Sequence, residues 1–439
     1  MVNYNEAMQY LENASKGTAL GLYSIGNILR HLGNPEKNLR IIHVGGTNGK
    51  GSTSTFIAEM LEEMGYRVGL YTSPFLEEFN ERIQINKKNI ANSDLAKMIG
   101  KTKIAIDKYV AEGNPEPTEF EITTAAAYQY FYEQQVDWVV LEVGLGGELD
   151  ATNTCEPTLS VLTSISIDHV DYLGDDLLKI AETKAGIIKE NKPAVLYHQS
   201  PEVEEVIKNR AEDTNSQLVI TNPDSLVMKS GDIFGQTFDV EVLGRKFNEI
   251  SISMTGAHQV KNFVTALTAI CLLEQLGEIR AVSDDEIKKA AKKAKWKGRT
   301  ELLLTEPMTI LDGAHNLDGA SVLAKYIKDF LADKEILLVF GMLKDKDIDG
   351  TLSLLAPLAK NFVVTLPDSP RAATADEMSA IIRKYQQKDA HITVRERIED
   401  AVEYAQAFGT KEKATIIYAG SLYMIGAART ALRKKYNLG

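Results

Sequence analysis

The sequence predicts an α/β protein of two domains, each built around a mostly parallel sheet. At 439 residues the chain exceeds the size of one ordinary hydrophobic core. Residues 137–144 and 158–166 are near-continuous apolar runs, which are typical of strands buried on both faces of a parallel sheet. A second alternation of strand-like and helical segments begins beyond residues 296–299, so we divide the chain into domains at 1–297 and 298–439.

The predicted elements of the first domain alternate in type along the chain. Residues 38–44 form a short β-branched run bounded by glycine, and residues 52–66 carry apolar side chains at helical spacing. We also expect a helix that is opened by a Ser93 cap and another that ends at Gly277. The remaining predictions are strands at residues 67–73 and 235–242 and helices at residues 93–110, 119–135 and 262–277.

The second domain is predicted from five strand-like segments with helical segments between them. This pattern indicates a smaller α/β domain. The strand-like segments are residues 308–316, 335–343, 361–366, 391–394 and 414–420.

Composition excludes several classes of protein. The net charge of −12 argues against a general nucleic-acid surface, and the basic residues 288–299 are interpreted first as a solvated helix face. No run of about 18 apolar residues occurs in the sequence, which argues against a membrane-spanning helix. The N-terminus lacks the apolar segment of a signal peptide, and the only cysteines, Cys155 and Cys271, favour a reducing cytoplasm. A monomer is the default expectation.

The stretch "IIHVGGTNGKGSTSTF" places a glycine-rich turn between a buried strand and a helix. Its spacing differs from the usual P-loop, because Val44 stands where the first glycine belongs and Gly51 where the hydroxyl belongs. The arrangement still aims backbone N–H groups and a helix N-terminus at an anion. Lys50 adds a positive charge, and the hydroxyl of Ser52 or Thr53 is placed to reach a magnesium ion. Phosphate binding is therefore favoured over a plain flexible turn.

Three further residues have both a functional and a structural interpretation. Glu142 ends a buried strand, where a carboxylate can hold magnesium at the ligand-binding edge of a parallel sheet; the alternative is a carboxylate that caps a turn. His169 also follows a buried strand, and by itself it is expected to be a structural histidine. Lys184 by itself is expected to be an exposed helix residue.

Several motifs resemble one known family. "GGTNGKGST" is similar to the ATP loop of the Mur ligase superfamily, and "TSPFLEEFNERIQIN" resembles its folylpolyglutamate synthase and dihydrofolate synthase branch. Further motifs match along nearly the whole chain, namely "LEVGLGGELDATN", "SISIDHVDYLG", "TKAGIIK", "TGAHQVKN", "GRTEL", "LDGAHN", "FGMLKDKD" and "YAGSLYMIG". The resemblance implies an N-terminal P-loop-type ATPase domain with a mostly parallel sheet and a smaller C-terminal, Rossmann-like glutamate ligase domain.

The resemblance also implies the residues that bind ATP. In the loop these are Thr47, Asn48, Gly49, Lys50, Gly51 and Ser52. Gln259 and Asn262 stand about one helical turn apart, where their amides can meet the adenine edge, although helix amides are commonly exposed. Arg299 matches an arginine that contacts ATP phosphate. Asp312 and His315 match residues that face the nucleotide phosphates and the reacting centre.

Two magnesium sites are implied as well. The matching ligands are Ser52, Ser73, Glu142 and His169, and the imidazole suits a second, substrate-side ion because magnesium prefers oxygen. Lys184 matches a lysine that is often carbamylated in the family, which would make it a metal ligand. Asp312 either orients a neighbouring side chain or assists proton transfer. The residues to which catalysis is assigned are Lys50, His169, Lys184, Asp312 and His315.

The implied reaction is an ATP-driven activation of a carboxylate. Transfer of the γ-phosphoryl group gives an acyl phosphate, which the amine of L-glutamate attacks, so that an amide, ADP and phosphate are formed. The carboxylate belongs to a folate that carries glutamate or to dihydropteroate. The residues assigned to the folate site are Phe75, Phe79 and Arg82. The two aromatic rings either stack near the pterin or serve as simple anchors.

Two positions depart from the family pattern. Many members have arginine where this chain has Glu148 and histidine where it has Phe75. These differences put dihydropteroate activity in doubt, so the main hypothesis is a folylpolyglutamate synthase and the alternative is an enzyme that makes both products. A Mur-type ligase of cell-wall precursors is disfavoured, because a uridine-nucleotide domain would be expected before the ATP loop. A non-catalytic nucleotide switch is disfavoured, because it would need neither a second metal site nor "LDGAHN".

Overall fold

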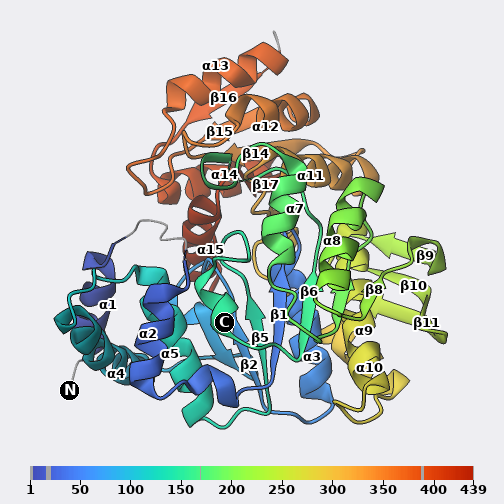
Figure 1. Ribbon diagram of the computed structural model, residues 1–439. Coiled ribbons are helices and arrows are strands. Elements are labelled where there is room, and N and C mark those ends of the chain that lie inside the picture. Colours follow the sequence, from blue (N-terminus) through green and yellow to red (C-terminus); the bar gives the residue numbers. More distant parts are fainter. Residues whose placement is uncertain (1–2, 16–20, 169, 387–389, 439) are drawn as a thin grey trace. The chain divides into compact units, whose positions relative to one another are not determined.

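The computed structural model describes residues 3–15, 21–168, 170–386 and 390–438. The chain divides into two compact units, and Figure 1 labels helices and strands of both where there is room. The N-terminal unit comprises Met1–Met228, Phe238–Ser251 and Lys261–Ala294. The C-terminal unit comprises Lys229–Thr237, Ile252–Val260 and Lys295–Gly439.

The sheet of the N-terminal unit has, within the described residues, the strand order β4-β3-β2-β5-β1-β6-β7-β8. Strand β1 (Ile41–Gly45) lies between β5 (Trp138–Glu142) and β6 (Leu159–Leu162) and is parallel to both. The sheet continues in parallel through β2 (Val68–Tyr71), β7 (Ala194–Leu196) and β8 (Leu218–Ile220). At one edge it adds the antiparallel strands β3 (Ile83–Ile85) and β4 (Lys88–Asn89). The prediction of a mostly parallel sheet is confirmed.

The register of the central strands fixes the position of the candidate site. Val44 of β1 lies opposite Glu142 of β5, so both strands end at the same edge of the sheet. In an open parallel sheet, ligands bind outside this carboxyl edge.

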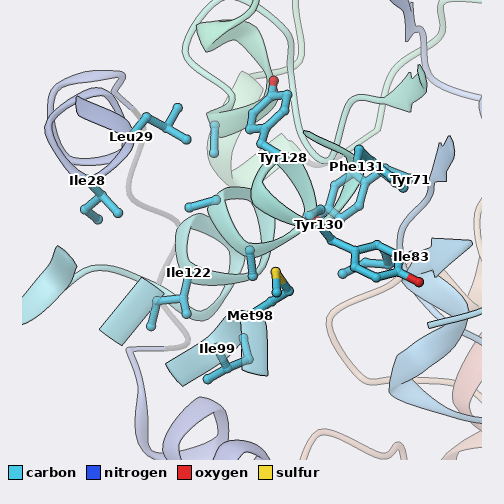
Figure 2. Close-up of a cluster of buried hydrophobic side chains, with 14 of the residues drawn as sticks. Ile28, Leu29, Tyr71, Ile83, Met98, Ile99, Ile122, Tyr128, Tyr130 and Phe131 are labelled. Carbon is cyan, nitrogen blue, oxygen red and sulfur yellow. The ribbon is translucent and has the colours of Figure 1, made fainter. Parts of the chain in front are cut away.

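A large hydrophobic core joins the sheet to the helices α1 (Tyr4–Asn13), α2 (Tyr23–Leu32), α4 (Asn92–Ala111) and α5 (Glu119–Glu133). Figure 2 shows this core, with Ile28 and Leu29 from α2, Ile122 and Phe131 from α5, and Tyr71 from the sheet. A capping box of Thr118 and Glu121 sets the start of α5.

The predicted Ser93 cap is wrong. Helix α4 begins at Asn92 after an extended Ala91, and Ser93 lies within its first turn. The physical reason lies just before the helix, where the N–H of Ile90 donates to Ile83 O (2.8 Å) and holds the chain to the β3 strand. The chain therefore enters the helix as soon as this bond ends.

Helix α3 (Lys50–Glu63) packs against β1, β2 and β5. Its Phe56 ring meets the edge of Phe263 at a centroid distance of 5.2 Å, which joins α3 to the helix α9 (Ala257–Gln275). Helix α10 (Asp284–Lys293) also packs on α3. A second apolar cluster joins β6 and β7 to the helices α7 (Leu177–Ala185) and α8 (Pro201–Asp213).

A buried chain of polar side chains ties β1 to the loop after β5. The Thr152 hydroxyl donates to Asp150 Oδ1 (2.5 Å), so it must accept a hydrogen bond from Nε2–H of His43 (2.9 Å). The other ring nitrogen of His43 faces Cys155 Sγ at 3.8 Å. Burial lowers the pKa of His43 to about 3 and raises the pKa of Cys155 to about 12, so both groups are neutral at physiological pH.

A separate sheet has the strand order β11-β10-β9 within the described residues. Its strands are β9 (Leu226–Asp232), β10 (Gly235–Val242) and β11 (Arg245–Ile252). Strand β10 has the bounds that its alternating sequence predicts. Nowhere in the described parts of the chain is a helix long and apolar enough to cross a membrane.

The C-terminal unit contains a sheet of order β12-β13-β17-β14-β15-β16 in the part of the chain that the structure describes. The strands are β12 (Glu301–Thr305), β13 (Met308–Leu311), β14 (Ile336–Phe340), β15 (Asn361–Val364), β16 (His391–Val394) and β17 (Thr415–Ala419). Among the described residues of this sheet, the edge strand β12 pairs antiparallel with β13, and the other strand pairs are parallel. The helices are α11 (Leu317–Phe330), α12 (Ile348–Leu355), α13 (Ala375–Gln386), α14 (Ile398–Glu412) and α15 (Leu422–Tyr436). The predicted Rossmann-like α/β arrangement is confirmed.

Helix α3 ends in three acidic side chains. Glu59 is buried and accepts a hydrogen bond from Lys87 Nζ (2.5 Å), and Glu63 pairs with Lys293 Nζ (2.5 Å). Burial, followed by the nearby charge of Glu59, raises the pKa of Glu62 to about 7. A negative charge at a helix C-terminus is also disfavoured by the helix dipole. The ionised form of Glu62 therefore destabilises the folded protein.

Replacing Glu62 with glutamine is expected to stabilise the protein above pH 7 and to have little effect below pH 4.5. The folded state keeps the Glu62 proton up to about pH 7, whereas the unfolded state releases it near 4.5, so the stability that the neutral carboxyl provides is lost as pH rises between these values. Because solvent screens this partly exposed group, the expected gain at pH 8 is about 1 kcal/mol. Urea unfolding at several pH values measures it.

Glu63→Gln is the matched control, because it removes an acid from the same turn but breaks the pair with Lys293. It should give no gain at pH 8. An equal effect of Glu62→Gln at pH 5 and pH 8 would contradict the assigned burial penalty.

Candidate active site

The glycine-rich loop between β1 and α3 depends on two left-handed glycines. Gly46 has a φ of 140° and Gly49, which precedes the first residue of α3, a φ of 85°. A Cβ at Gly46 would overlap the Thr163 hydroxyl, and a Cβ at Gly49 would overlap Oδ1 of Asn262. Side chains press on this loop from two directions, so glycine is required at both positions. The first N–H groups of α3 have no acceptor within the helix and point out of its N-terminus.

The loop is fastened to the end of the neighbouring strand β6. The N–H groups of Thr47 and Asn48 both donate to Ser164 O, at 2.7 and 3.4 Å. The Thr47 hydroxyl donates to Ser166 O (2.9 Å) and accepts from Ser166 N (3.0 Å). These bonds show that the backbone of Thr47 and Asn48 anchors the loop.

Two lysine side chains converge on the loop. Lys50 Nζ donates to Thr47 O (3.0 Å) and Gly46 O (3.3 Å), and Lys184 Nζ donates to Gly46 O (2.9 Å). The interpretation of Lys184 as an exposed helix residue is wrong, because the side chain is only 4% exposed. Burial first, and then the charge of Lys50, lower the pKa of Lys184 to about 7. The loop thus brings two lysine nitrogens to the carbonyl oxygens of its own backbone.

Glu142 and Ser73, two of the predicted metal ligands, lie together at the carboxyl edge of the sheet. Glu142 ends β5, is 4% exposed, and accepts a hydrogen bond from the Ser73 N–H (3.1 Å). Ser52, in the first turn of α3, is also buried. A carboxylate and two hydroxyls are oxygen donors of the kind that magnesium takes together with phosphate oxygens, so these residues fit the predicted ion. The fourth predicted ligand, His169, lies outside the described residues.

The predicted folate-site residues form one cluster. The Arg82 guanidinium lies over the rings of Phe75 and Phe79, at 5.5 and 5.2 Å, and it pairs with Glu119 at 3.5 Å. Phe79 is buried and Phe75 packs against the large core. The interpretation of the rings as anchors therefore describes Phe79 best. The segment between them is closed by Glu81, whose carboxylate accepts from two backbone N–H groups.

Glu148 has a fixed backbone and an exposed side chain. Its N–H donates to Thr183 O (2.8 Å), and its carbonyl accepts from Asn153 Nδ2 (2.8 Å). The preceding loop is closed by Asp150, which accepts from the Leu145 N–H (2.8 Å). Glu148 therefore places a negative charge on the surface next to the candidate site, where many family members have arginine. Nothing in the structure explains this difference.

Gln259 and Asn262 are both buried, so the expectation that these amides are commonly exposed does not hold here. Within the N-terminal unit the Asn262 amide lies directly against Gly49 of the phosphate loop. The residues that sequence reasoning missed in this unit are Thr163 and Ser164, which fasten the loop. Both lie inside the apolar run at residues 158–166 that predicts a strand, whereas β6 ends at Leu162. The hydroxyls at the end of this run are the signal that could have found them.

In the C-terminal unit, both carboxylate oxygens of Asp312 are engaged with the backbone. Oδ2 accepts from the Thr300 N–H and Oδ1 from the Ala314 N–H, each at 2.8 Å. Burial raises the pKa of Asp312, and the charge of Arg299 opposes the rise. The neighbouring His315 donates from Nδ1–H to Gly313 O (2.7 Å), which fixes the orientation of its ring.

Comparison with known proteins places this geometry in a family. The Mur ligase middle domain matches residues 44–270, and the Mur ligase glutamate ligase domain matches residues 298–422. The chain is 35% identical to the dihydrofolate synthase/folylpolyglutamate synthase of Bacillus subtilis, over 98% of this chain and 99% of that protein. The chain belongs to the folylpolyglutamate synthase and dihydrofolate synthase family of Mur ligases. Its members are ATP-dependent ligases.

Other members of the family show the same breadth of similarity. The folylpolyglutamate synthase of Lacticaseibacillus casei is 32% identical over 98% of this chain and 99% of its own length. The Mycobacterium tuberculosis folylpolyglutamate synthase in complex with ADP and AMPPCP has a TM-score of 0.89 at 29% identity and covers 97% of both chains. A family structure described as an FPGS-AMPPCP-folate complex has a TM-score of 0.84 at 30% identity and covers 100% of both chains.

Replacing Gly49 with alanine is expected to weaken ATP binding by more than about tenfold, which corresponds to about 1.4 kcal/mol. The new Cβ would overlap Asn262 and would also oppose the left-handed backbone, so the loop must move. Isothermal titration of ATP into the protein measures the change.

Gly65→Ala is the matched control, because Gly65 also has a left-handed backbone (φ 89°) but no atom lies within 4 Å of its would-be Cβ. Gly65→Ala should lower the free energy of unfolding by about 1 kcal/mol and leave ATP affinity unchanged. Equal ATP affinities for both variants would show that the packing of Asn262 on the loop is unimportant.

Proposed function

We propose that the protein acts as a folylpolyglutamate synthase. It joins the amine of L-glutamate to the glutamate carboxylate of a reduced folate, with ATP converted to ADP and phosphate. The observation that carries this proposal is the phosphate loop at the end of β1, on which Lys50 and Lys184 converge while Glu142 and Ser73 lie at the same sheet edge. Membership in the family supplies the substrate class.

A carboxylate reacts poorly with an amine, because its charge repels the nucleophile and oxide is a poor leaving group. Transfer of the γ-phosphoryl group to the folate carboxylate gives an acyl phosphate, which the glutamate amine can attack. In our proposal the start of α3 and the Lys50 ammonium group stabilise the charge on the transferred group, which is the main catalytic contribution in such reactions. Magnesium, when bound by Ser52, Ser73 and Glu142, would supply further charge neutralisation.

The C-terminal residues have different proposed roles. Asp312 braces the chain around Arg299, which supports its role in orienting a neighbouring side chain rather than in proton transfer, because both its oxygens already accept backbone N–H groups. Arg299 is proposed to contact ATP phosphate, and His315 to face the reacting centre. Gln259 and Asn262 are proposed nucleotide contacts. The second magnesium site, with His169, stays a prediction.

The proposal also covers the domain bounds, the cellular location and the assembly. We propose residues 1–297 as the ATP-binding domain and residues 298–439 as the glutamate ligase domain, which is supported by the start of the glutamate ligase match at residue 298. A cytoplasmic location is supported by two cysteines that are both free and buried. A monomer is proposed as the simplest assembly.

The first test measures glutamate-dependent phosphate release from ATP, separately with a reduced folate and with dihydropteroate. We expect turnover with the folate and a kcat/KM for dihydropteroate at least about tenfold lower, a difference of about 1.4 kcal/mol in transition-state stabilisation. Glu148→Arg should raise activity with dihydropteroate while leaving the melting temperature unchanged, because the Glu148 side chain is exposed.

Glu156→Arg, the same charge change at another exposed position of this segment, is the control and should leave both activities unchanged. Equal use of both substrates by the wild type would show a bifunctional enzyme. A folded protein that binds ATP but releases phosphate with neither substrate would refute the ligase proposal.

We also predict that Lys184 is carbamylated. Its buried amine lies beside the phosphate loop, and a carbamate nitrogen keeps the hydrogen with which it donates to Gly46 O. Protein equilibrated with ¹³C-bicarbonate should give one carbamate carbon resonance in NMR spectra, and Lys184→Met should abolish it. If the two spectra are identical, Lys184 acts as an amine.

A further inference from the structure

Arg299 stands in a turn with an unfavourable backbone. Gly298 has a φ of 69° and Thr300 a φ of 44°. For a β-branched residue such as threonine a left-handed conformation is a genuine outlier. Such a conformation persists only where the surrounding contacts are strong enough to enforce it. Residues with such backbone strain are common at functional sites. The contacts that hold this turn therefore also decide where the Arg299 side chain lies.

Hydrogen bonds from the backbone of the turn hold it in place. Gly298 O accepts from the Gly313 N–H (2.7 Å), and the Thr300 N–H donates to Asp312 (2.8 Å). Both of these bonds go to the loop after β13. A third bond holds the turn to the side chain of Glu301, whose Oε2 accepts from the Gly298 N–H (2.8 Å).

The Glu301 carboxylate is itself oriented by Arg429 of helix α15. Nε of Arg429 lies 3.1 Å from both carboxylate oxygens, and Nη2 lies 2.9 Å from Oε1. The two side chains are only 18% and 10% exposed, so solvent screens the pair little. The guanidinium fork fixes the plane of the carboxylate, and this leaves Oε2 aimed at Gly298.

Helix α15 connects this pair to the rest of the site. Leu422, its first residue, packs so closely on Gly313 that a Cβ there would overlap it. Arg429 lies about two helical turns after Leu422 on the same helix. One helix thus contacts the loop after β13 at its start and sets the Glu301 carboxylate further along.

We propose that Glu301 and Arg429 are positioning residues, which hold the Gly298–Thr300 turn so that Arg299 is presented to the nucleotide phosphate. The proposal rests on the proposed function, in which Arg299 contacts ATP. Neither Glu301 nor Arg429 is assigned a substrate contact. Their effect passes through the backbone N–H of Gly298 and through the direction of the Arg299 side chain.

The test compares Glu301→Gln and Arg429→Lys with the wild type. Lysine keeps the charge at position 429 but cannot reproduce the planar fork, and glutamine removes the charge at position 301. Each variant should weaken binding of magnesium-ATP at least about fivefold in isothermal titration and raise KM for ATP, with kcat and the KM for glutamate changed by less than about twofold. Lys435→Met is the control, because it breaks another ion pair of α15, with Glu403 (2.6 Å). It should leave ATP affinity unchanged.

A double-mutant cycle identifies the route of the effect. In the Arg299→Ala background, Glu301→Gln should change ATP affinity by less than about twofold, because the group that it positions is already missing. If the two changes multiply, Glu301 does not act through Arg299 and the proposal is overturned. It is also overturned if Glu301→Gln and Arg429→Lys bind ATP like the wild type.

Hydrogen exchange provides a readout that needs no activity. Amides of residues 298–301 should exchange faster in Glu301→Gln and Arg429→Lys, but not in Lys435→Met. Unchanged exchange in this segment would refute the positioning role. A wild type that binds ATP but forms no amide with any folate would refute the proposed function, while ATP affinity and exchange would still decide the role of this pair.

Discussion

The carbonyl of Gly46 is the acceptor on which the candidate active site depends. The side-chain nitrogens of Lys50, at the start of α3, and of Lys184, on α7, both donate to it. Two ammonium groups this close repel each other, and burial together with the charge of Lys50 lowers the pKa of Lys184 to about 7. The Gly46 carbonyl accepts from both nitrogens whether or not Lys184 is charged, and the ammonium of Lys50 attracts a polyanion such as a nucleoside triphosphate to the loop.

The position of this carbonyl is set by the fold rather than by the loop alone. Strand β1 is central and paired in parallel on both sides, so its end cannot move without its neighbours. The Ser164 carbonyl after β6 holds the loop from one side, and Asn262 presses on Gly49 from another. Glu142, the predicted carboxylate ligand of magnesium, ends the neighbouring strand β5, in register with Val44. The site is therefore a consequence of where three parallel strands stop.

The sequence was sufficient for features that depend on local pattern. Buried parallel strands such as β5 have no polar face, so each can be recognised in the sequence as a continuous apolar run. The phosphate loop was found because glycine, lysine and hydroxyl residues are contiguous. Lys184 was misjudged as exposed because its burial comes from residues 138 positions away, around Gly46. The edge strand β12 escaped notice for a similar reason, since only pairing with β13 gives it strand character.

Both cysteine thiols are unreactive in the folded protein because they are buried. Cys155 faces His43 in the interior, and Cys271 is also buried; burial raises the pKa of each thiol to about 12. Neither thiol forms the thiolate that alkylating reagents attack at neutral pH. A single cysteine introduced on the surface would therefore be the reactive thiol of the folded protein. The native sequence thus already permits selective attachment of a spectroscopic label to either unit, with both natural cysteines left in place.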